Sequence, residues 1–305
     1  MDQVTSHIMM IRPSAFGYNA ETAMNNAFQH KPEDASITEV ESKACNEFDS
    51  FAQLLQREGI DVTVLEDSIS PRKPDAVFPN NWISFHGGGT IVTYPMYSSL
   101  RRNERREDLI SQLASRFRIR DWIRLEDFEK KNQYLEGTGS MVLDRVAKIA
   151  YACISERTDK DLLEHWCSQM GFTPQTFHAV SNGKPVYHTN VMMAIGSNVA
   201  LACLECVSDK IERQALKESL SATHEFVEIT AAQVQSFAGN MLALKNNRGE
   251  ELMVMSSRAL ESLTDEQKNK IEEFCRIVAS PINTIEDIGG GSARCMIAEI
   301  FLDPN

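Results

Sequence analysis

The sequence lacks any apolar stretch long enough to cross a membrane. Its longest apolar runs, such as Val199–Cys203, are far shorter than the roughly 18 residues that a spanning helix requires. The first residues, MDQVTSHIMMIRP, lack the basic start, the apolar stretch and the small-residue cleavage site of a signal peptide. We therefore expect a cytoplasmic protein that has no membrane partner.

The chain also has fewer basic residues than acidic ones. The chain has 31 Lys and Arg residues against 43 Asp and Glu residues, which gives a net charge of −12. An acidic chain repels phosphate backbones, so we expect no nucleic-acid partner. The densest basic stretch, Arg101–Asp108 (RRNERRED), carries its own acids, and this pattern is typical of a solvated helix face.

Nucleotide and zinc motifs are missing. The sequence has no G-x-x-x-x-G-K-[ST] loop, and GTGSMV at Gly137 lacks the third glycine of a dinucleotide fingerprint. The seven cysteines are an odd number without framework spacing, which indicates reduced thiols. Cys203 and Cys206 form a C-x-x-C motif inside an apolar stretch that we expect to be a strand, where positions three apart point to opposite faces. Without a second pair, they predict no zinc site.

What the sequence does have is an internal repeat. Four segments share the form of a strand, a tight turn and a second apolar strand, and their turn-side residues are Asn81, Gly139, Asn190 and Asn240. The interval of about 50 residues lies within the range of repeat architectures. A fifth copy is split between HIMMIRP near the start and GGGSARCMIAEIF near the end.

Helix-like stretches with apolar residues at three-to-four spacing lie between the copies: Glu39–Glu58, Asp159–Met170 and Thr264–Ile277. Short strands beginning near Asp61, Trp122 and His224 also lead into the modules. No linker rich in Pro, Gly or Ser separates two halves. The pattern favours one closed α/β domain over residues 1–305. The alternative is an ordinary α+β protein whose hairpins merely look alike, and the period by itself does not decide whether the array closes.

Cys295 is the strongest candidate for chemistry. It follows three glycines and an arginine in GGGSARC, and cationic surroundings favour the nucleophilic thiolate. The competing interpretation is a small buried cysteine in a terminal strand. A cysteine nucleophile needs an acid–base partner, and His188, where a strand enters its turn, is our first choice among seven histidines. Taken alone, a histidine in the position of His188 is more often structural than catalytic, and His86 and His178 are weaker candidates.

Two carboxylates complete the set. Glu136 precedes Gly-Thr-Gly at what we expect to be a hairpin tip, and Asp75 lies at the equivalent place in the preceding module. Asp75, Glu136, His188 and Cys295 all fall at the same end of their modules. In a closed array that end of every module faces one axis, so we expect these four side chains to converge.

The motifs LEGTGS, SERT, YHTN and GGGSARC, in this order, resemble the guanidino-group-modifying enzymes of the pentein superfamily. These include arginine deiminases, dimethylarginine hydrolases and amidinotransferases. MIRPSAFGYNAETAMNNAFQ and DAVFPNNW resemble more closely the bacterial branch of citrulline-utilisation hydrolases. The resemblance runs from about Ile8 to the last residues. It implies a five-bladed α/β propeller of pseudo-fivefold symmetry that needs no metal or organic cofactor.

The resemblance also implies roles for residues around the reacting group. Cys295 matches the family nucleophile, His188 the general acid–base, and Glu136 the carboxylate that orients the substrate or the histidine. Asp75 matches an acid that contacts the substrate nitrogens, and Phe78 an aromatic that packs on the planar group.

Further residues match positions that bind the amino-acid end. Arg157 resembles an arginine that binds the substrate carboxylate, and Arg101 and Arg102 fall near another such arginine, with the spacing leaving open which is used, if either. The chain departs from the deiminase pattern at Asn80 and Asn81, where those enzymes carry acids. A guanidinium presents only donors and a positive charge, whereas an amide complements a neutral ureido group.

The resemblance therefore favours a hydrolase that converts citrulline to ornithine, CO2 and ammonia through a covalent cysteine intermediate. Asparagine at this place also occurs in relatives that hydrolyse arginine twice, so an arginine deiminase or arginine dihydrolase is the alternative. A second alternative is a non-catalytic binding module, like the ribosome anti-association factors of the same fold. The presence of Cys295, His188 and Glu136 and the acidic charge disfavour it. We expect a small amino-acid substrate, and a homo-oligomer is compatible with the sequence.

Overall fold

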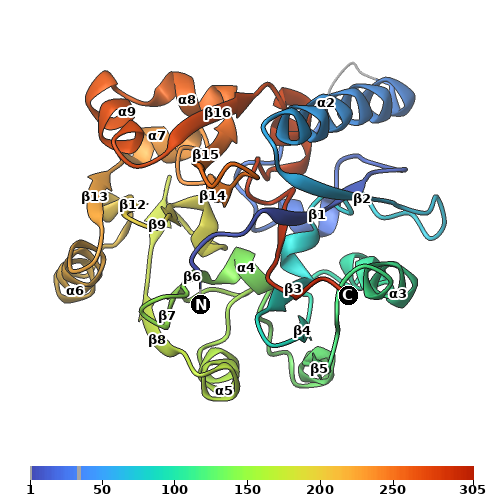
Figure 1. Cartoon of the computed structure of the whole chain (residues 1–305), viewed down its shortest axis with the longest axis horizontal. Helices are drawn as coiled ribbons and strands as arrows, with labels where there is room; N and C mark the ends of the chain where they lie inside the picture. The colour runs from blue at the N-terminus through green and yellow to red at the C-terminus, as the bar shows by residue number, and fades with distance from the viewer. Residues whose placement is uncertain (1, 33–35) are drawn as a thin grey trace.

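Five three-stranded sheets are arranged around a common centre in the computed structural model, which describes residues 2–32 and 36–305 (Figure 1). In each of four sheets, an antiparallel hairpin is followed by a third strand that runs parallel to the second. The four are β3 (Ile83–His86), β4 (Thr90–Thr93) and β5 (Asp121–Arg124); β6 (Val142–Asp144), β7 (Ile149–Cys153) and β8 (Thr173–Phe177); β11 (Met193–Ile195), β12 (Val199–Ala202) and β13 (Glu225–Glu228); and β14 (Leu242–Lys245), β15 (Glu251–Ser256) and β16 (Arg276–Ser280).

The fifth sheet joins the two ends of the described chain. Strand β17 (Ala298–Ile300) pairs antiparallel with β1 (His7–Arg12), which pairs parallel with β2 (Asp61–Glu66). This is the same arrangement as in the other sheets, so the prediction of a split fifth copy is confirmed. The inner hairpin strands of neighbouring sheets contact one another, β17 with β3, and β11 with β6 and β14.

Helices supply the crossovers that parallel strand pairs require. They connect the second to the third strand of each sheet and lie on the outside of the molecule (Figure 1). These helices are α2 (Ile37–Arg57), α3 (Glu107–Ala114), α5 (Lys160–Met170), α6 (Lys210–Ser221), α8 (Ser257–Ser262) and α9 (Asp265–Glu272). The shorter α1 (Ala20–Ala23), α4 (Gly137–Ser140) and α7 (Ala231–Gln235) and the small hairpin β9 (Val180–Ser181) and β10 (Lys184–Pro185) lie in the connections.

The longest helix shows why these segments are helical. At the start of α2, the Ser36 side chain accepts from the Glu39 backbone N–H while the Glu39 carboxylate accepts from Ser36, which is a complete capping box. Its buried face is formed by apolar side chains at three-to-four spacing, among them Val40, Ala44, Phe48, Phe51 and Leu55. The predicted helix Glu39–Glu58 is confirmed within two residues at its start.

Three local predictions are wrong. Helix α9 ends at Glu272 instead of continuing to Ile277, because the β-branched residues of Arg276–Ser280 join the sheet as β16. Cys203 and Cys206 do not point to opposite faces. Strand β12 ends at Ala202 and a 3₁₀ turn follows, which brings the two buried sulfur atoms to 3.2 Å.

The third wrong prediction concerns the basic stretch Arg101–Asp108. Its first residues form a 3₁₀ helix, Leu100–Glu104, in which Arg101 and Glu104 are buried. The stretch is therefore not a fully solvated face, because two of its seven charged residues lie inside the protein. None of the helices in the described ranges has the length and apolar character of a membrane span.

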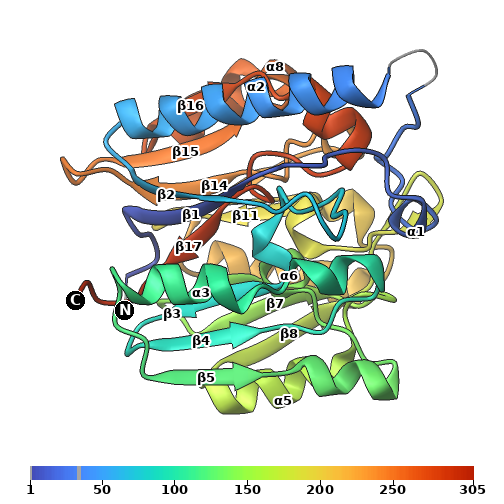
Figure 2. The same ribbon diagram turned by 90° about the vertical axis from the view of Figure 1, so that its right-hand side faces the viewer.

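The two ends of the sheets differ. Helix α1 and the connections next to it lie at one end of the strands, whereas the chain termini lie at the opposite end (Figure 2). The end that carries α1 holds the cavity described next.

Candidate active site

A small cavity brings together residues that are far apart in the sequence. Its volume is about 20 Å³, which is room for one water molecule. Four of the five sheets contribute through the segments that precede their strands. The lining residues are Thr22, Asn26, Asp75, Phe78, Asn81, Arg101, Arg157, Tyr187, His188, Gly289, Gly290, Gly291 and Cys295.

Cys295 lies in the turn that leads into β17, and its side chain is buried. The glycines before it allow a close approach of the backbone to Phe78. A Cβ on Gly291 would lie 2.9 Å from the Phe78 ring and 3.3 Å from Cys295 Cβ, and one on Gly289 would lie 2.8 Å from the same ring. The glycine run is therefore needed to fit the aromatic ring beside the thiol.

Two asparagine side chains contact the sulfur. The amide nitrogens of Asn190 and Asn240 donate to Cys295 Sγ at 3.4 and 3.2 Å. Sequence reasoning named both residues only as turn markers of the repeat. Their position equivalent to Asn81 was a usable signal, because the repeat places the same turn of each module at the same end of its sheet.

His188 and Glu136 form a buried pair. His188 Nε2 lies 2.8 Å from Glu136 Oε2, and the other oxygen, Oε1, accepts from the Tyr97 backbone N–H at 2.9 Å. With the proton on Nε2, Nδ1 carries the free lone pair. Gly139 leaves room beside this ring, because an added Cβ there would lie 2.8 Å from Nδ1. Glu136 is the residue before the short helix α4, so the prediction that it sits at a hairpin tip is wrong.

The electrostatics of this pair keep the imidazole neutral and the carboxylate charged. Burial, only partly opposed by Glu136, lowers the pKa of His188 to about 4. Burial would raise the pKa of Glu136, but Arg157 and the hydrogen bond from His188 outweigh it and lower that pKa to about 2. At neutral pH, His188 is therefore available as a base.

Arg101 organises the opposite wall. Its guanidinium bonds to Glu104 at 2.9 and 2.8 Å and to Asn81 Oδ1 at 2.8 Å, and its Nε lies 3.7 Å from Asp75 Oδ2. Burial raises the pKa of Asp75, and it raises the pKa of Glu104 to about 7 despite Arg101. Arg102 points elsewhere, to Glu129 at 3.2 Å with a side chain 34% exposed, so it lies outside the site.

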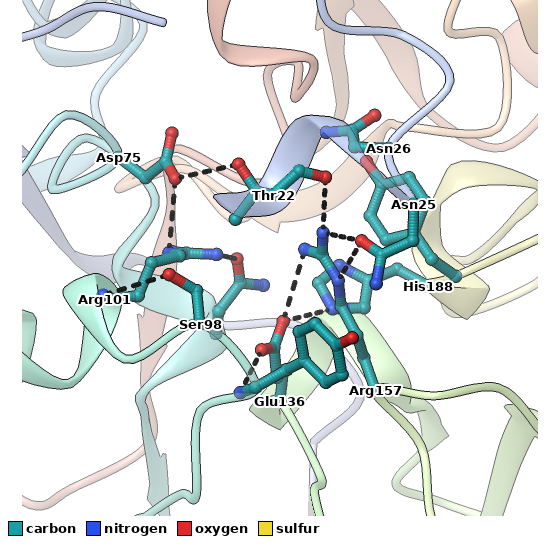
Figure 3. Close-up of polar contacts among 12 residues, drawn as sticks. Thr22, Asn25, Asn26, Asp75, Ser98, Arg101, Glu136, Arg157 and His188 are labelled. Atoms are coloured by element: carbon teal, nitrogen blue, oxygen red, sulfur yellow. Dashed lines mark hydrogen bonds and ion pairs between the residues drawn. The ribbon is translucent and has the colours of Figure 1, made fainter. Parts of the chain in front are cut away.

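Arg157 holds the segment Asn19–Asn26, here called the cover segment, over the cavity. Its guanidinium donates to Asn25 Oδ1 at 3.0 Å and to Thr22 O at 3.0 Å, and its Nη1 lies 3.6 Å from Glu136 Oε2. Figure 3 shows the two arginines on either side of Thr22, with Asp75 beside Arg101 and His188 beside Arg157.

Further bonds fasten the cover segment to the site. Asn19 donates to Asp75 Oδ2 at 2.7 Å, and Asn26 donates to Gly290 O at 3.2 Å. The Tyr187 hydroxyl donates to the same carbonyl at 2.9 Å. Sequence reasoning used this segment only for the resemblance and assigned none of its residues to the site.

Several buried polar atoms at the site have no hydrogen-bond partner among the described residues. They are Asn81 Nδ2, Asp75 Oδ1, Asn190 Oδ1 and Asn240 Oδ1, together with both amide atoms of Asn80. Asp75 and Asn81 line the cavity, whereas Asn80, Asn190 and Asn240 lie behind its lining residues. The backbone carbonyl of Asn80 accepts from Thr138 at 3.3 Å. Buried polar groups are normally paired, so a cluster of unpaired ones next to a cavity indicates a binding site.

In the described ranges, no group of three or more His, Cys, Asp and Glu side chains is placed to hold a metal ion. The chemistry that the arrangement offers is that of a thiol, a neutral imidazole with an orienting carboxylate, and amide groups around them.

The fold and the site together define a hydrolase of C–N bonds, one of the guanidino-group-modifying enzymes of the pentein superfamily. More narrowly, the family described as N,N dimethylarginine dimethylhydrolase, eukaryotic, matches residues 12–302, and the chain belongs to this family. The non-catalytic alternative is thereby set aside. No curated protein matches the chain by sequence.

Solved structures agree with this fold. Unliganded ArgZ, an arginine dihydrolase from the ornithine–ammonia cycle in cyanobacteria, superimposes with a TM-score of 0.74 at 15% identity, over 98% of this chain and 41% of that one. A complex of AgrE with L-arginine gives 0.75 at 14% identity, over 97% and 40%. A dimethylarginine dimethylaminohydrolase bound to S-methyl-L-thiocitrulline gives 0.65 at 17%, over 97% and 99%. The chain thus spans less than half of the full ArgZ and AgrE chains.

Proposed function

We propose that this enzyme hydrolyses the ureido group of citrulline, with Cys295 as the nucleophile, and releases ornithine, CO2 and ammonia. One observation carries the choice of a ureido substrate. Asn81 Oδ1 accepts from Arg101 Nη1 at 2.8 Å, which fixes the orientation of the amide and leaves Nδ2 as an unpaired buried donor. A ureido oxygen can accept from this donor, whereas a guanidinium has no acceptor to offer.

The charges of the site support the same choice. Each carboxylate already has a protein cation nearby: Arg101 lies beside Asp75 and Glu104, and Arg157 beside Glu136. A neutral ureido group leaves these ion pairs in place. A cationic guanidinium group would instead compete with Arg101 and Arg157 for the same carboxylates.

The mechanism follows from the groups. His188 Nδ1 takes the thiol proton of Cys295, and the thiolate attacks the ureido carbon. The same proton then goes to the departing nitrogen, so ammonia leaves and a thiocarbamate remains on Cys295. His188 next takes a proton from water, whose oxygen attacks the thiocarbamate. The thiolate leaves, and the released N-carboxy-ornithine loses CO2 to give ornithine. Glu136 holds the imidazole and stabilises its transient charge.

The remaining residues bind and orient the substrate in this proposal. Phe78 packs on the planar ureido group, and Asp75 Oδ1 accepts from a ureido N–H. Arg157 binds the carboxylate of the amino-acid end once the cover segment moves. The proposal places this chemistry at one end of a five-bladed propeller of pseudo-fivefold symmetry, which residues 1–305 form as a single catalytic domain in the cytoplasm. No cofactor takes part in any of these steps.

Arginine is the second candidate, and Asp75 is the observation in its favour. The carboxylate has one unpaired oxygen, Oδ1, which could form a charge-assisted bond with a guanidinium. An arginine dihydrolase would convert arginine to ornithine, one molecule of CO2 and two molecules of ammonia through the same thiol.

A parallel assay separates the two candidates. The purified protein is incubated with citrulline and, separately, with arginine, and ornithine, citrulline and ammonia are quantified. We expect ornithine from citrulline alone. Ornithine or citrulline formed from arginine at a comparable rate would overturn the proposed specificity, and no product from either would overturn the function. The variant Cys295→Ser is the control for contaminating activity.

The substitution Asn81→Asp tests the role of the amide directly. An acidic oxygen facing the ureido oxygen places two acceptors together, whereas facing a guanidinium it gains a charge-assisted pair. We expect the ratio of kcat/KM for citrulline to that for arginine to fall about a hundredfold. A ratio that stays within about threefold of wild type would show that Asn81 does not distinguish the two groups.

A further inference from the structure

The surroundings of the Cys295 sulfur contain amide donors in place of a positive charge. Reactive cysteines are usually activated by a nearby cation or a helix N-terminus. Here the cations of the cavity are engaged elsewhere: Arg101 is bonded to Glu104 and Asn81, and Arg157 to Asn25 and Thr22 O. His188 is held neutral by burial. What does reach Sγ is the pair of amide nitrogens at 3.4 and 3.2 Å.

The side chain of Asn240 is also bonded to the backbone of Asn190. Asn240 Nδ2 donates to Asn190 O at 3.0 Å as well as to the sulfur, and its backbone N–H donates to Phe237 O at 2.8 Å. The preceding residue, Gly239, allows this contact, because a Cβ there would lie 2.3 Å from Val191 O. The segments that precede β11 and β14 are thus in close contact. Their side-chain amides both donate to the sulfur of Cys295, which precedes β17 of a third sheet.

The amide orientation is the one that a thiolate requires. Both residues are fully buried, and with Nδ2 on the sulfur their Oδ1 atoms stay unpaired. A buried carbonyl oxygen without a partner costs free energy. The arrangement is understandable if the oxygens face the N–H groups of a bound substrate while the nitrogens face the nucleophile.

We propose that Asn190 and Asn240 are positioning residues that hold Cys295 Sγ through two neutral N–H donors and stabilise its thiolate before the substrate binds. The proposal rests on the proposed function in taking Cys295 as the nucleophile. The thiol proton still goes to His188 Nδ1, which returns it to the leaving nitrogen, so the two amides lower the free energy of the thiolate that this transfer creates. Asn240 is the dominant member, because its contact is shorter and it is anchored to Asn190.

The first experiment measures alkylation of Cys295 by iodoacetamide as a function of pH. Trypsin cleaves after Arg294, and the peptide from Cys295 to Asn305 holds no other cysteine, so mass spectrometry reports this thiol alone. The half-buried Cys45, on the peptide between Lys43 and Arg57, is the internal reference. The variants are Asn240→Leu, which removes the donor, and Asn240→Asp, which places an acid beside the sulfur.

We expect alkylation of Cys295 at neutral pH to slow about tenfold in Asn240→Leu, and at least as much in Asn240→Asp. At high pH, where any thiol is ionised, both rates should return to within about twofold of wild type. A purely structural role would not produce this recovery. Alkylation of Cys45 should stay unchanged in both variants.

A matched control lies in the same hairpin. Asn246 is a buried asparagine at the other end of β14, where it caps its own turn by accepting from the Arg248 and Glu250 N–H groups. Asn246→Leu should leave the pH curve of Cys295 alkylation in place, even if it lowers the melting temperature. If this control shifts the curve as much as Asn240→Leu does, the effect comes from loosening of the hairpin and the proposal fails.

The second measurement is the pH profile of kcat/KM for the substrate that is turned over. We expect its acid limb to move to higher pH in Asn240→Leu, with the loss of rate mainly in kcat. If neither the alkylation curve nor the acid limb moves, the proposal is overturned. Failure of the proposed function is a separate result: it would appear as turnover retained by Cys295→Ser, whatever the Asn240 variants do.

Discussion

Two buried histidines in this molecule have very different surroundings. His86 on β3 contacts Ser84 Oγ at 2.7 Å through Nε2, and Arg145 Nη1 lies 3.4 Å from its Nδ1. His188 contacts Glu136 through Nε2, and its Nδ1 has no partner among the described residues. The serine–histidine pair looks more like a nucleophile and its base. Yet it has no orienting carboxylate, and both ring nitrogens of His86 are occupied.

The difference between the two histidines lies in whether the polar groups around them have hydrogen-bond partners. The Ser84 cluster is closed: Ser84 also bonds to the Tyr94 hydroxyl at 2.6 Å, which accepts from Trp166 Nε1 at 3.1 Å. Around His188, the polar atoms next to the cavity are left unpaired. A satisfied polar network stabilises a core, whereas an unsatisfied one next to a cavity is ready for a ligand.

The largest contrast is expected between Cys295→Ser and Ser84→Ala. A serine hydroxyl has little anionic character at neutral pH, so Cys295→Ser should lower turnover by at least about a hundredfold while substrate still binds. Ser84→Ala should keep turnover within about threefold and lower the free energy of unfolding by about 1–3 kcal/mol, because it leaves buried partners unpaired. Steady-state kinetics and urea unfolding measure both. If Ser84→Ala lost as much turnover as Cys295→Ser, the assignment of catalysis to the Cys295 site would be wrong.

The histidines themselves give the next contrast. His188→Gln removes the base and should lower kcat by about 10²- to 10⁴-fold. Because the same base activates water in the second step, the variant should also accumulate a covalent adduct on Cys295, which intact-protein mass spectrometry detects after mixing with substrate. His86→Gln should leave kcat near wild type. A large loss of kcat in a well-folded His86→Gln would contradict the comparison.

Two buried arginines extend the contrast to binding. Arg157→Ala should raise KM about tenfold or more and change kcat less, because the contact it would make with the substrate carboxylate is remote from the reacting carbon. Arg145 stacks on Phe301 at 3.9 Å, and Arg145→Ala should affect stability but not KM. If Arg157→Ala instead leaves KM unchanged and collapses kcat, the residue acts through Glu136, which lies 3.6 Å away.

The pH dependence of stability is the one property in which the two histidines should behave alike, so here the contrast between them is smallest. Burial lowers the pKa of His188 to about 4 and that of His86 well below its usual 6.5. The unfolded chain therefore binds more protons than the folded one between about pH 4 and pH 6.5, and stability falls as pH falls through this window. His188 should account for up to about 3 kcal/mol of that loss. Urea midpoints of wild type, His188→Gln and His86→Gln, measured at both ends of the window, should show a flatter curve in each variant.

The repeat made much of the fold predictable. Because Asn81, Gly139, Asn190 and Asn240 recur at a regular interval, the hairpins, their helices and the split fifth sheet followed from the sequence, and the structure has them. Helix ends were less predictable. The segment after Glu272 has a helical pattern locally, but pairing with β15 decides its conformation.

The site was predictable only where a residue type suggests chemistry. Cys295, His188 and Glu136 are the kinds of residue that a nucleophile, a base and its orienting acid require. The buried state of Arg101, the half-buried position of Arg102 outside the site and the orientation of the Asn190 and Asn240 amides depend on contacts between sheets. A basic stretch looks solvated until the fold supplies Glu104 and Asn81 as buried partners.

The pairing of β17 with β1 has a consequence for synthesis on the ribosome. Strand β1 is made first and β17 is made about 290 residues later, yet they share one sheet, with His7 opposite Ile300. Domains acquire structure as the chain emerges, N-terminal parts first. Here the edge of β1 that pairs with β17 has no strand beside it until nearly the whole described chain has been translated. Until then Cys295 is also absent from the cavity. A nascent chain can therefore contain His188, Glu136, Arg101 and Arg157 and still be inactive. We expect activity to begin only when β17 pairs with β1 and brings Cys295 to the cavity.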